Sequence, residues 1–242
     1  MRYPEVLEAE FVKRPNRFVA FCLLGGREVK VHVKNTGRCK ELLLPGAKVF
    51  LERASHQNRK TAFSLVAVKK GDRIVNIDSQ APNEAVYEAL MADKLSLPGM
   101  NGKELITREV SYHNSRLDMK IEGSFVTGFV ETKGVTLEID NKATFPDAPT
   151  VRGVKHLQSL AHASQAGYMA YVIFVIQMKG VDLFLPNDGM HPQFGDALRE
   201  AVRGGVIPLA YDCEVTPDSL TVAESVTVNM EGFNEKEEKI HI

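Results

Sequence analysis

The chain has 242 residues, 44% of them hydrophobic, so it can bury a substantial core and is long enough for two domains. Its longest apolar run, residues 170–176, is far too short to span a bilayer, and the first residues carry charges where a signal peptide is apolar. Three scattered cysteines, Cys22, Cys39 and Cys213, match neither a zinc spacing nor a disulfide framework, so we expect a cytoplasmic protein without a membrane partner.

Charge is distributed unevenly along the chain. Residues 1–80 hold 16 Lys and Arg against 8 Asp and Glu, a net charge of +8, whereas residues 81–242 hold 14 against 23, a net charge of −9. A basic part joined to an acidic remainder is typical of a module that binds a polyanion on a second domain. We predict DNA as the partner, with RNA as a second candidate. The alternative is that these basic residues decorate a soluble surface.

Six short strand patterns occupy the first 80 residues, at 7–13, 17–24, 28–33, 48–52, 61–68 and 74–77. Gly25-Gly26 predicts a hairpin turn between the second and the third. So many short strands favour a small barrel over residues 1–80, with an OB-fold as the leading candidate, and such barrels bind oligonucleotides through a basic face. The cations that we expect against phosphates are Arg14, Arg17, Arg38, Arg59 and Lys60.

Residues 81–230 are expected to form an α/β (α+β) domain, followed by a polar tail at 231–242. Asn83 is predicted to cap a helix at 84–92, on which Glu84 and Glu88 share one face. The remaining predicted strands are 104–110, 115–122, 125–133, 169–177, 181–185 and 206–215, and the remaining helices are 150–165 and 192–203.

The hairpin at 115–133 carries the candidate catalytic residues. Side chains alternate across a strand, so Arg116 and Asp118 share one face of the first strand, and Glu131 and Lys133 share one face of the second. If the hairpin pairs in register, Asp118 and Glu131 meet with Lys133 beside them. Two carboxylates beside a lysine can hold a hard cation such as Mg²⁺ or Mn²⁺. The alternative is a set of charged residues on a solvated sheet face.

The predicted helix at 150–165 has an unusual polar face. Arg152, Lys155 and His156 lie on it together with Ser159, and the helix contains no carboxylate. We predict that Arg152, Lys155 and His156 contact nucleic-acid phosphates, with Arg116 as a further contact from the hairpin. The alternative is a plain solvated face.

Several sequence motifs together resemble one known family. They are NTGR at 35–38, ELLLPG at 41–46, SRLD at 115–118, ETKGVTL at 131–137, FPDA at 145–148 and RGVKHL at 152–157. Over almost the whole chain, this set is similar to the sugar fermentation stimulation protein A family. The resemblance implies an OB-fold, a second domain similar to PD-(D/E)XK nucleases, and a DNA-binding protein linked to sugar-utilisation genes. It also implies nuclease-like residues at Asp118, Glu131 and Lys133, with Glu88 as the carboxylate from the preceding helix.

Other catalytic classes lack their motifs. The sequence has no GxSxG elbow, no GxGxxG loop and no histidine pair with zinc spacing. Two functions remain. The first is a Mg²⁺- or Mn²⁺-dependent nuclease whose metal is held by Asp118, Glu131 and Glu88. The second is a non-enzymatic DNA-binding regulatory protein of sugar-utilisation genes with a vestigial nuclease site. The sequence leaves the oligomeric state open, a homodimer included.

Overall fold

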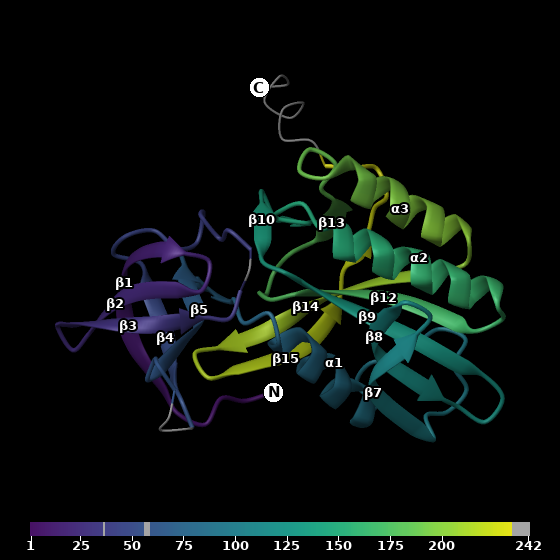
Figure 1. The fold of residues 1–242 in the computed structure, drawn as a ribbon, viewed down its shortest axis with the longest axis horizontal. Coiled ribbons are helices and arrows are strands. Elements are labelled where there is room, and N and C mark those ends of the chain that lie inside the picture. The colour runs from purple at the N-terminus through teal and green to yellow at the C-terminus, as the bar shows by residue number, and fades with distance from the viewer. Residues whose placement is uncertain (36, 56–58, 234–242) are drawn as a thin grey trace.

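The molecule consists of a β-barrel, on the left of Figure 1, and a larger α/β domain on its right. The computed structural model describes residues 1–35, 37–55 and 59–233. The barrel strands are β1 (Val6–Asn16), β2 (Val19–Leu24), β3 (Arg27–Val33), β4 (Lys48–Arg53), β5 (Phe63–Lys70) and β6 (Arg73–Asn76). They follow the order β3-β2-β1-β4-β5-β6, and parallel pairing of β3 with β5 closes the first five into a barrel. The predicted OB-fold is confirmed.

Alternating burial explains why these segments form a barrel. In β2, Ala20 and Cys22 point into the core while their neighbours are partly exposed, as expected of strands with one face inward. Gly25 and Gly26 have φ values of +56° and +77°, which suit a two-residue hairpin turn and confirm the predicted turn between β2 and β3. All six predicted barrel strands are present, and their ends shift by at most three residues.

The second domain is built around a six-stranded mixed sheet with the order β15-β14-β12-β9-β8-β7. Its strands are β7 (Leu105–Tyr112), β8 (Ser115–Glu122), β9 (Thr127–Val135), β12 (Met169–Ile176), β14 (Ile207–Thr216) and β15 (Ser219–Ser225). The central strand β12 pairs in parallel with β9 and β14, and every residue after Met169 is buried. Burial on both faces accounts for the continuous apolar run that the sequence shows there.

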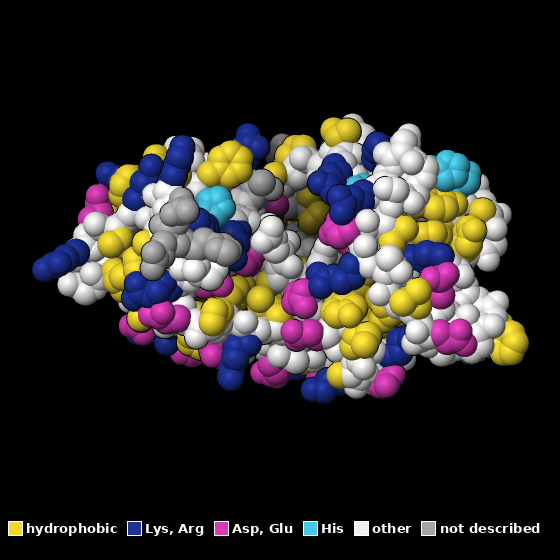
Figure 2. Space-filling model, turned by 60° about the horizontal axis from the view of Figure 1, so that its bottom comes forward, with side chains coloured by type: hydrophobic (Ala, Val, Ile, Leu, Met, Phe, Trp, Pro, Cys, Tyr) yellow, Lys and Arg dark blue, Asp and Glu magenta, His cyan; other side chains and the backbone are white. Residues whose placement is uncertain are grey.

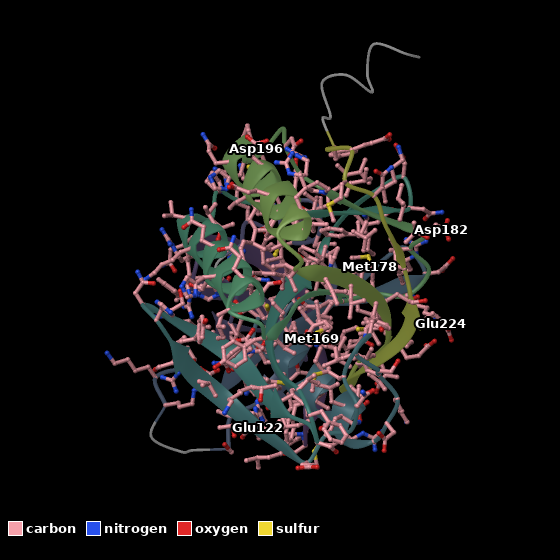
Figure 3. All side chains as sticks on the ribbon, turned by 90° about the vertical axis from the view of Figure 1, so that its right-hand side faces the viewer. Glu122, Met169, Met178, Asp182, Asp196 and Glu224 are labelled. Carbon is pink, nitrogen blue, oxygen red and sulfur yellow. The ribbon has the colours of Figure 1, made fainter. Side chains whose placement is uncertain are left out.

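Helices cover both faces of this sheet. Helix α1 (Ala81–Met91) packs against β9 and β15 on one face, and helix α2 (Val151–Gln165) packs against β8, β9 and β12 on the other. Helix α3 (Pro192–Arg203) lies against α2. Figure 3 shows side chains filling the space between the layers, with Asp196 marking α3 and Met169 marking the start of β12.

Four strands were not predicted from the sequence, and α1 begins earlier than predicted. A small sheet with the order β10-β11-β13-β16 contains three of the four. The missed strands are β10 (Leu137–Ile139), β11 (Lys142–Phe145), β15 and β16 (Thr227–Val228), and the remaining member of the small sheet is β13 (Leu183–Pro186). Segments of two to four residues are too short to show an alternating pattern. The predicted tail lies outside the described residues from residue 234 onward.

The earlier start of α1 changes the role of Asn83. The helix begins at Ala81 and Gln80 occupies the N-cap position, so Asn83 is not the cap. Pro82 explains the earlier start, because proline fits the first turn of a helix, where its missing N–H has no intrahelical partner to lose. Asn83 consequently lies within the helix, where its side chain reaches strand β8.

A buried polar network joins the two domains. The Gln177 side-chain amide, just after β12, donates to Oδ1 of Asn76 at 2.8 Å and to the carbonyl of Asp78 at 3.1 Å. On the barrel side, Nζ of Lys34 lies 3.0 Å from carboxylate oxygens of both Glu52 and Asp78. Apolar side chains of the barrel and of the large sheet also belong to one continuous core. The buried bonds of Gln177 and this shared core hold the barrel at a defined position beside the sheet. Within the described ranges, no helix is both long and apolar enough to cross a membrane.

Candidate active site in the interdomain cleft

Two adjoining cavities lie between the barrel and the α/β domain. Their volumes are about 930 Å³ and about 810 Å³, and both are lined by Thr132 and Lys133 of β9 and by Thr150 at the start of α2. Figure 2 shows a hollow between the two halves of the molecule, with basic and acidic side chains at its rim. A ligand that occupied both cavities would pass directly over Thr132 and Lys133.

The two cavities differ in charge. The larger one is lined by six cations, which are Lys13, Arg14, Arg17, Arg38, Lys40 and Lys133. Among its described lining residues, Asp147 is the one carboxylate. The smaller cavity contains six carboxylates, from Glu52, Asp78, Glu84, Glu109, Asp118 and Glu131, next to five Lys and Arg side chains. The cleft is therefore basic beside the barrel and rich in carboxylates beside the sheet.

Asp118 lies where strands β8 and β9 begin to separate. The last bridged pair of the two strands is Met119 with Val130, and the same register places Asp118 opposite Glu131, as predicted. Oδ1 of Asp118 accepts a hydrogen bond of 2.7 Å from Nδ2 of Asn83 on α1. Oδ2 accepts hydrogen bonds of 2.7 Å from both the backbone N–H and the hydroxyl of Thr132. These three bonds fix the orientation of the carboxylate.

Glu131 is buried, with 3% of its surface exposed, and its two oxygens have different surroundings. Oε1 contacts Nζ of Lys133 and Nδ1 of His156. Oε2 is buried and has no hydrogen-bond partner among the described residues. Nε2 of His156 accepts a hydrogen bond of 3.2 Å from Nε of Arg152, so both nitrogens of this buried ring are in use. His156 therefore positions Glu131 from α2, with its proton on Nδ1.

Burial and charge push the pKa values of the two carboxyl groups in opposite directions. Burial raises the pKa of Asp118, and the negative charge of Glu131 raises it further, against the effects of Lys133 and Thr132. Burial also acts to raise the pKa of Glu131, but the charge of Lys133 and the hydrogen bond from His156 outweigh it, so the pKa is lowered. Glu131 is thus held as an anion, and Asp118 takes up a proton more readily than an ordinary aspartate.

Glu88, the predicted helix carboxylate, lies apart from this group. Its side chain is half exposed, lines neither cavity and forms an ion pair of 2.6 Å with the terminal amine of Met1. Glu84, one helical turn earlier, does line the smaller cavity and pairs with Arg108 at 2.8 Å. Among the described residues, no group of three or more His, Cys, Asp or Glu side chains is arranged to hold a metal ion.

The predicted phosphate contacts on the barrel divide into two kinds. Arg17 and Arg38 are exposed and line the basic cavity. Arg14 also lines it, but its guanidinium donates to four backbone carbonyls at 2.6 to 2.9 Å, those of Arg17, Asn35, Gly37 and Arg38. Arg14 thereby holds the loop that carries Arg38. Sequence alone could not separate Arg14 from Arg17, because both are arginines at the ends of the predicted strands 7–13 and 17–24.

The remaining predicted contacts are dispersed. Arg59 lines a third, smaller cavity on the barrel with Phe18 and His32, and Lys60 is exposed nearby. Arg116 forms an ion pair of 2.9 Å with Glu109. Arg152 lines the carboxylate-rich cavity, whereas Lys155, also on α2, is exposed and lines neither cavity of the cleft.

The sequence did not predict the parts that Asn83 and Thr150 play in the site, or the contact that Thr132 makes with Asp118. Asn83 and Thr132 bind Asp118, and Thr150 caps α2 by accepting a hydrogen bond of 3.0 Å from the N–H of Gly153. A cap at Thr150 could have been predicted from a threonine that follows a proline-rich segment. The roles of Asn83 and Thr132 depend on contacts between α1, β8 and β9, and no local pattern signals them.

Comparison with known proteins identifies the family. Residues 80–219 match the family model described as the sugar fermentation stimulation protein RE domain, and residues 12–77 match the model of the SfsA N-terminal OB domain. The chain belongs to the sugar fermentation stimulation protein family. This confirms the resemblance that the sequence motifs indicated.

Related proteins match over nearly their full length. A sugar fermentation stimulation protein homolog of Desulfitobacterium hafniense strain Y51 is 49% identical over 232 residues, covering 95% of this chain and 99% of the relative. A homolog of Clostridium beijerinckii is 48% identical over 228 residues, covering 94% and 99%. A solved structure, that of Pyrococcus furiosus SfsA in complex with Ca²⁺, is 28% identical, with a TM-score of 0.86 over 95% of this chain and 98% of that one.

Proposed function

We propose that this chain is a DNA-binding protein whose second domain is a Mg²⁺- or Mn²⁺-dependent nuclease of the PD-(D/E)XK type. One observation carries the proposal: Asp118, Glu131 and Lys133 come together where the basic and the carboxylate-rich parts of the cleft meet. A nucleic-acid backbone bound in the basic cavity would therefore place a phosphodiester beside the two carboxylates. Hydrolysis of a phosphodiester needs both features in one place.

The donor atoms suit a hard cation. Oε2 of Glu131 is an unpartnered buried acceptor, and Asp118 uses three of the roughly four acceptor positions of a carboxylate. Mg²⁺ is commonly held by one or two protein carboxylates together with water and substrate phosphates, so a third acidic ligand is not required. The Pyrococcus furiosus relative was solved in complex with Ca²⁺, which also prefers oxygen ligands. These points favour Asp118 and Glu131, with the carbonyl of Thr132, as the protein's share of a metal site.

The chain's own residues would divide the remaining work. When bound, the metal would supply a water of lowered pKa and offset negative charge on the phosphate. Lys133 lines both cavities and contacts Glu131, so its ammonium can donate to a water or a phosphate oxygen at this point. His156 and Arg152 act as positioning residues, because they hold Glu131 from α2. Arg17, Arg38 and their basic neighbours would bind the flanking phosphates.

The decisive experiment is a cleavage assay. Labelled single-stranded, duplex and branched DNA and RNA are incubated with Mg²⁺ or Mn²⁺ and either the wild type or Asp118→Ala. We expect metal-dependent cleavage by the wild type and none by the variant. A wild type that leaves every substrate intact in both metals would rule out the nuclease.

The small number of potential metal-ligating side chains favours a second function. Because the described residues hold no group of three potential metal ligands and Lys133 already pairs with Glu131, the site could instead be a structural remnant in a DNA-binding regulatory protein. On this alternative, the wild type binds DNA without cutting it. Replacement of Lys133 then changes stability alone.

A further inference from the structure

Beside the candidate site lies a cluster of rings that the nuclease proposal does not use. It consists of Tyr112, His113, Phe129, His162 and Tyr168, called the ring cluster below. The ring centres of His113 and His162 are 4.0 Å apart, those of Tyr112 and His113 are 4.9 Å apart, and those of Phe129 and Tyr168 are 5.3 Å apart. Phe129 is buried, whereas both histidines and Tyr168 are exposed. The cluster therefore presents aromatic and imidazole surface to solvent.

Helix α2 connects this cluster to the candidate site. His156, which holds Glu131, and His162 are six residues apart on α2, which corresponds to ~9 Å along the helix axis. Between them, Ser159 donates a hydrogen bond of 2.7 Å to Ser115 at the start of β8. The hydroxyl of Tyr112, at the end of β7, lies 3.1 Å from Nδ1 of His162. The ring cluster is thus fixed to the same strand and helix that position the two carboxylates.

The charge along α2 suits a polyanion. The helix contains no Asp or Glu, and Arg152 and Lys155 are both exposed in its first two turns. A chain of phosphates that left the cleft along α2 would meet these two cations and no carboxylate of the helix before it reached the rings. Bases attached to such a chain stack on aromatic side chains with little preference for sequence.

We propose that the ring cluster stacks the unpaired bases of a single-stranded nucleic acid that extends from the candidate site along α2. The inference rests on the proposed function and specifies its substrate class as a single strand or a duplex with a splayed end. Bases inside a duplex are already stacked on one another, so intact duplex offers the rings nothing to bind. The polar edges of the histidines and of Tyr112 fit heterocyclic bases better than a purely apolar partner.

Binding assays without divalent metal test this proposal separately from cleavage. Anisotropy of labelled single-stranded DNA, single-stranded RNA and blunt duplex is measured with the wild type and with a His113→Asn, Tyr168→Leu double variant. Asparagine is chosen because His113 has a φ of +50°, which asparagine tolerates. We expect about ten-fold weaker binding of single strands and unchanged binding of the duplex. The matched control is Phe125→Ser, which removes an aromatic side chain that is 88% exposed in the β8–β9 turn, and it should change neither affinity.

Fluorescence of 2-aminopurine gives a second readout that a structural role would not produce. When 2-aminopurine is placed in an unpaired overhang, its fluorescence should be quenched by the wild type and not by the double variant. If that variant fails to fold, His162→Gln at an exposed helix position serves the same purpose. The proposal would be overturned if the double variant lost affinity equally for single strands and duplex, or for neither. It would also be overturned if the wild type bound single strands without quenching. Quenching in a protein that cuts no substrate would support the ring cluster and refute the nuclease.

Discussion

Thr132 of β9 donates both its backbone N–H and its hydroxyl to one oxygen of Asp118 on the neighbouring strand β8. The two bonds fix the carboxylate although its surroundings disfavour its charge, since burial and Glu131 both raise its pKa. A group held in place against its own electrostatic preference is typical of a functional site.

Relative to an Asp118→Asn variant, the wild type should lose stability as the pH rises from acidic to neutral values. Because the folded-state pKa of Asp118 is raised, its favourable contribution is present at low pH and is lost as the pH rises through that pKa. Urea unfolding of both proteins at several pH values measures the difference in their free energies of unfolding, which should move in favour of the variant as the pH rises. A difference that does not change with pH would contradict the prediction.

The same variant should bind Mn²⁺ at least about ten-fold more weakly than the wild type in calorimetry, because it lacks one of two proposed carboxylate ligands. Glu88→Gln is the matched control: it also removes one carboxylate from this domain, but Glu88 pairs with the terminal amine and lines neither cavity of the cleft. Equal Mn²⁺ affinities for the wild type and Asp118→Asn would exclude the proposed site.

Wild-type Mn²⁺ affinity should fall as the solution is acidified, and should begin to fall at a higher pH than for an ordinary aspartate. A proton competes with the metal for Asp118, whose pKa is raised, while Glu131, whose pKa is lowered, stays ionised. Titrations from neutral to acidic pH would show this dependence. If the Mn²⁺ affinity stays constant until the pH falls to the range in which ordinary carboxyl groups titrate, Asp118 does not ligate the metal.

Lys133→Met should abolish metal-dependent cleavage and leave DNA affinity nearly intact, because several barrel cations line the basic cavity besides Lys133. It should also lower the free energy of unfolding by about 1 to 3 kcal/mol at neutral pH, since buried Glu131 loses a charged partner. Lys94→Met is the control, as that lysine is exposed and lines neither cavity of the cleft. Full cleavage activity in Lys133→Met would show that Lys133 takes no part in the chemistry.

Arg14→Ala and Arg17→Ala form a matched pair. Arg14→Ala should lower the free energy of unfolding by about 2 kcal/mol, because four carbonyls lose a charged donor. Arg17→Ala should leave stability unchanged and weaken DNA binding, and it should reduce the log–log salt slope by roughly 0.9 for the one phosphate contact that is lost. Chemical unfolding and salt-dependent anisotropy measure the two effects. The reverse outcome would show that Arg14, rather than Arg17, contacts the phosphates.

The sequence by itself determined the barrel, the central hairpin and the family. Alternating apolar residues and Gly25-Gly26 were enough to predict the strands of the OB-fold, because strand burial and tight turns are local properties. The register that brings Asp118 to Glu131 was likewise predictable, since a shift of one residue would turn every buried side chain of the hairpin outward.

Only the tertiary structure decided which charged residues work together. Glu84 and Glu88 share a helix face in the sequence, yet one lines the cleft and the other pairs with the terminal amine. Arg14 and Arg17 look alike in the sequence, yet one binds carbonyls of its own loop. The physical reason is that charge, burial and hydrogen bonding depend on which elements lie within a few ångströms of one another, and packing between distant segments determines those distances.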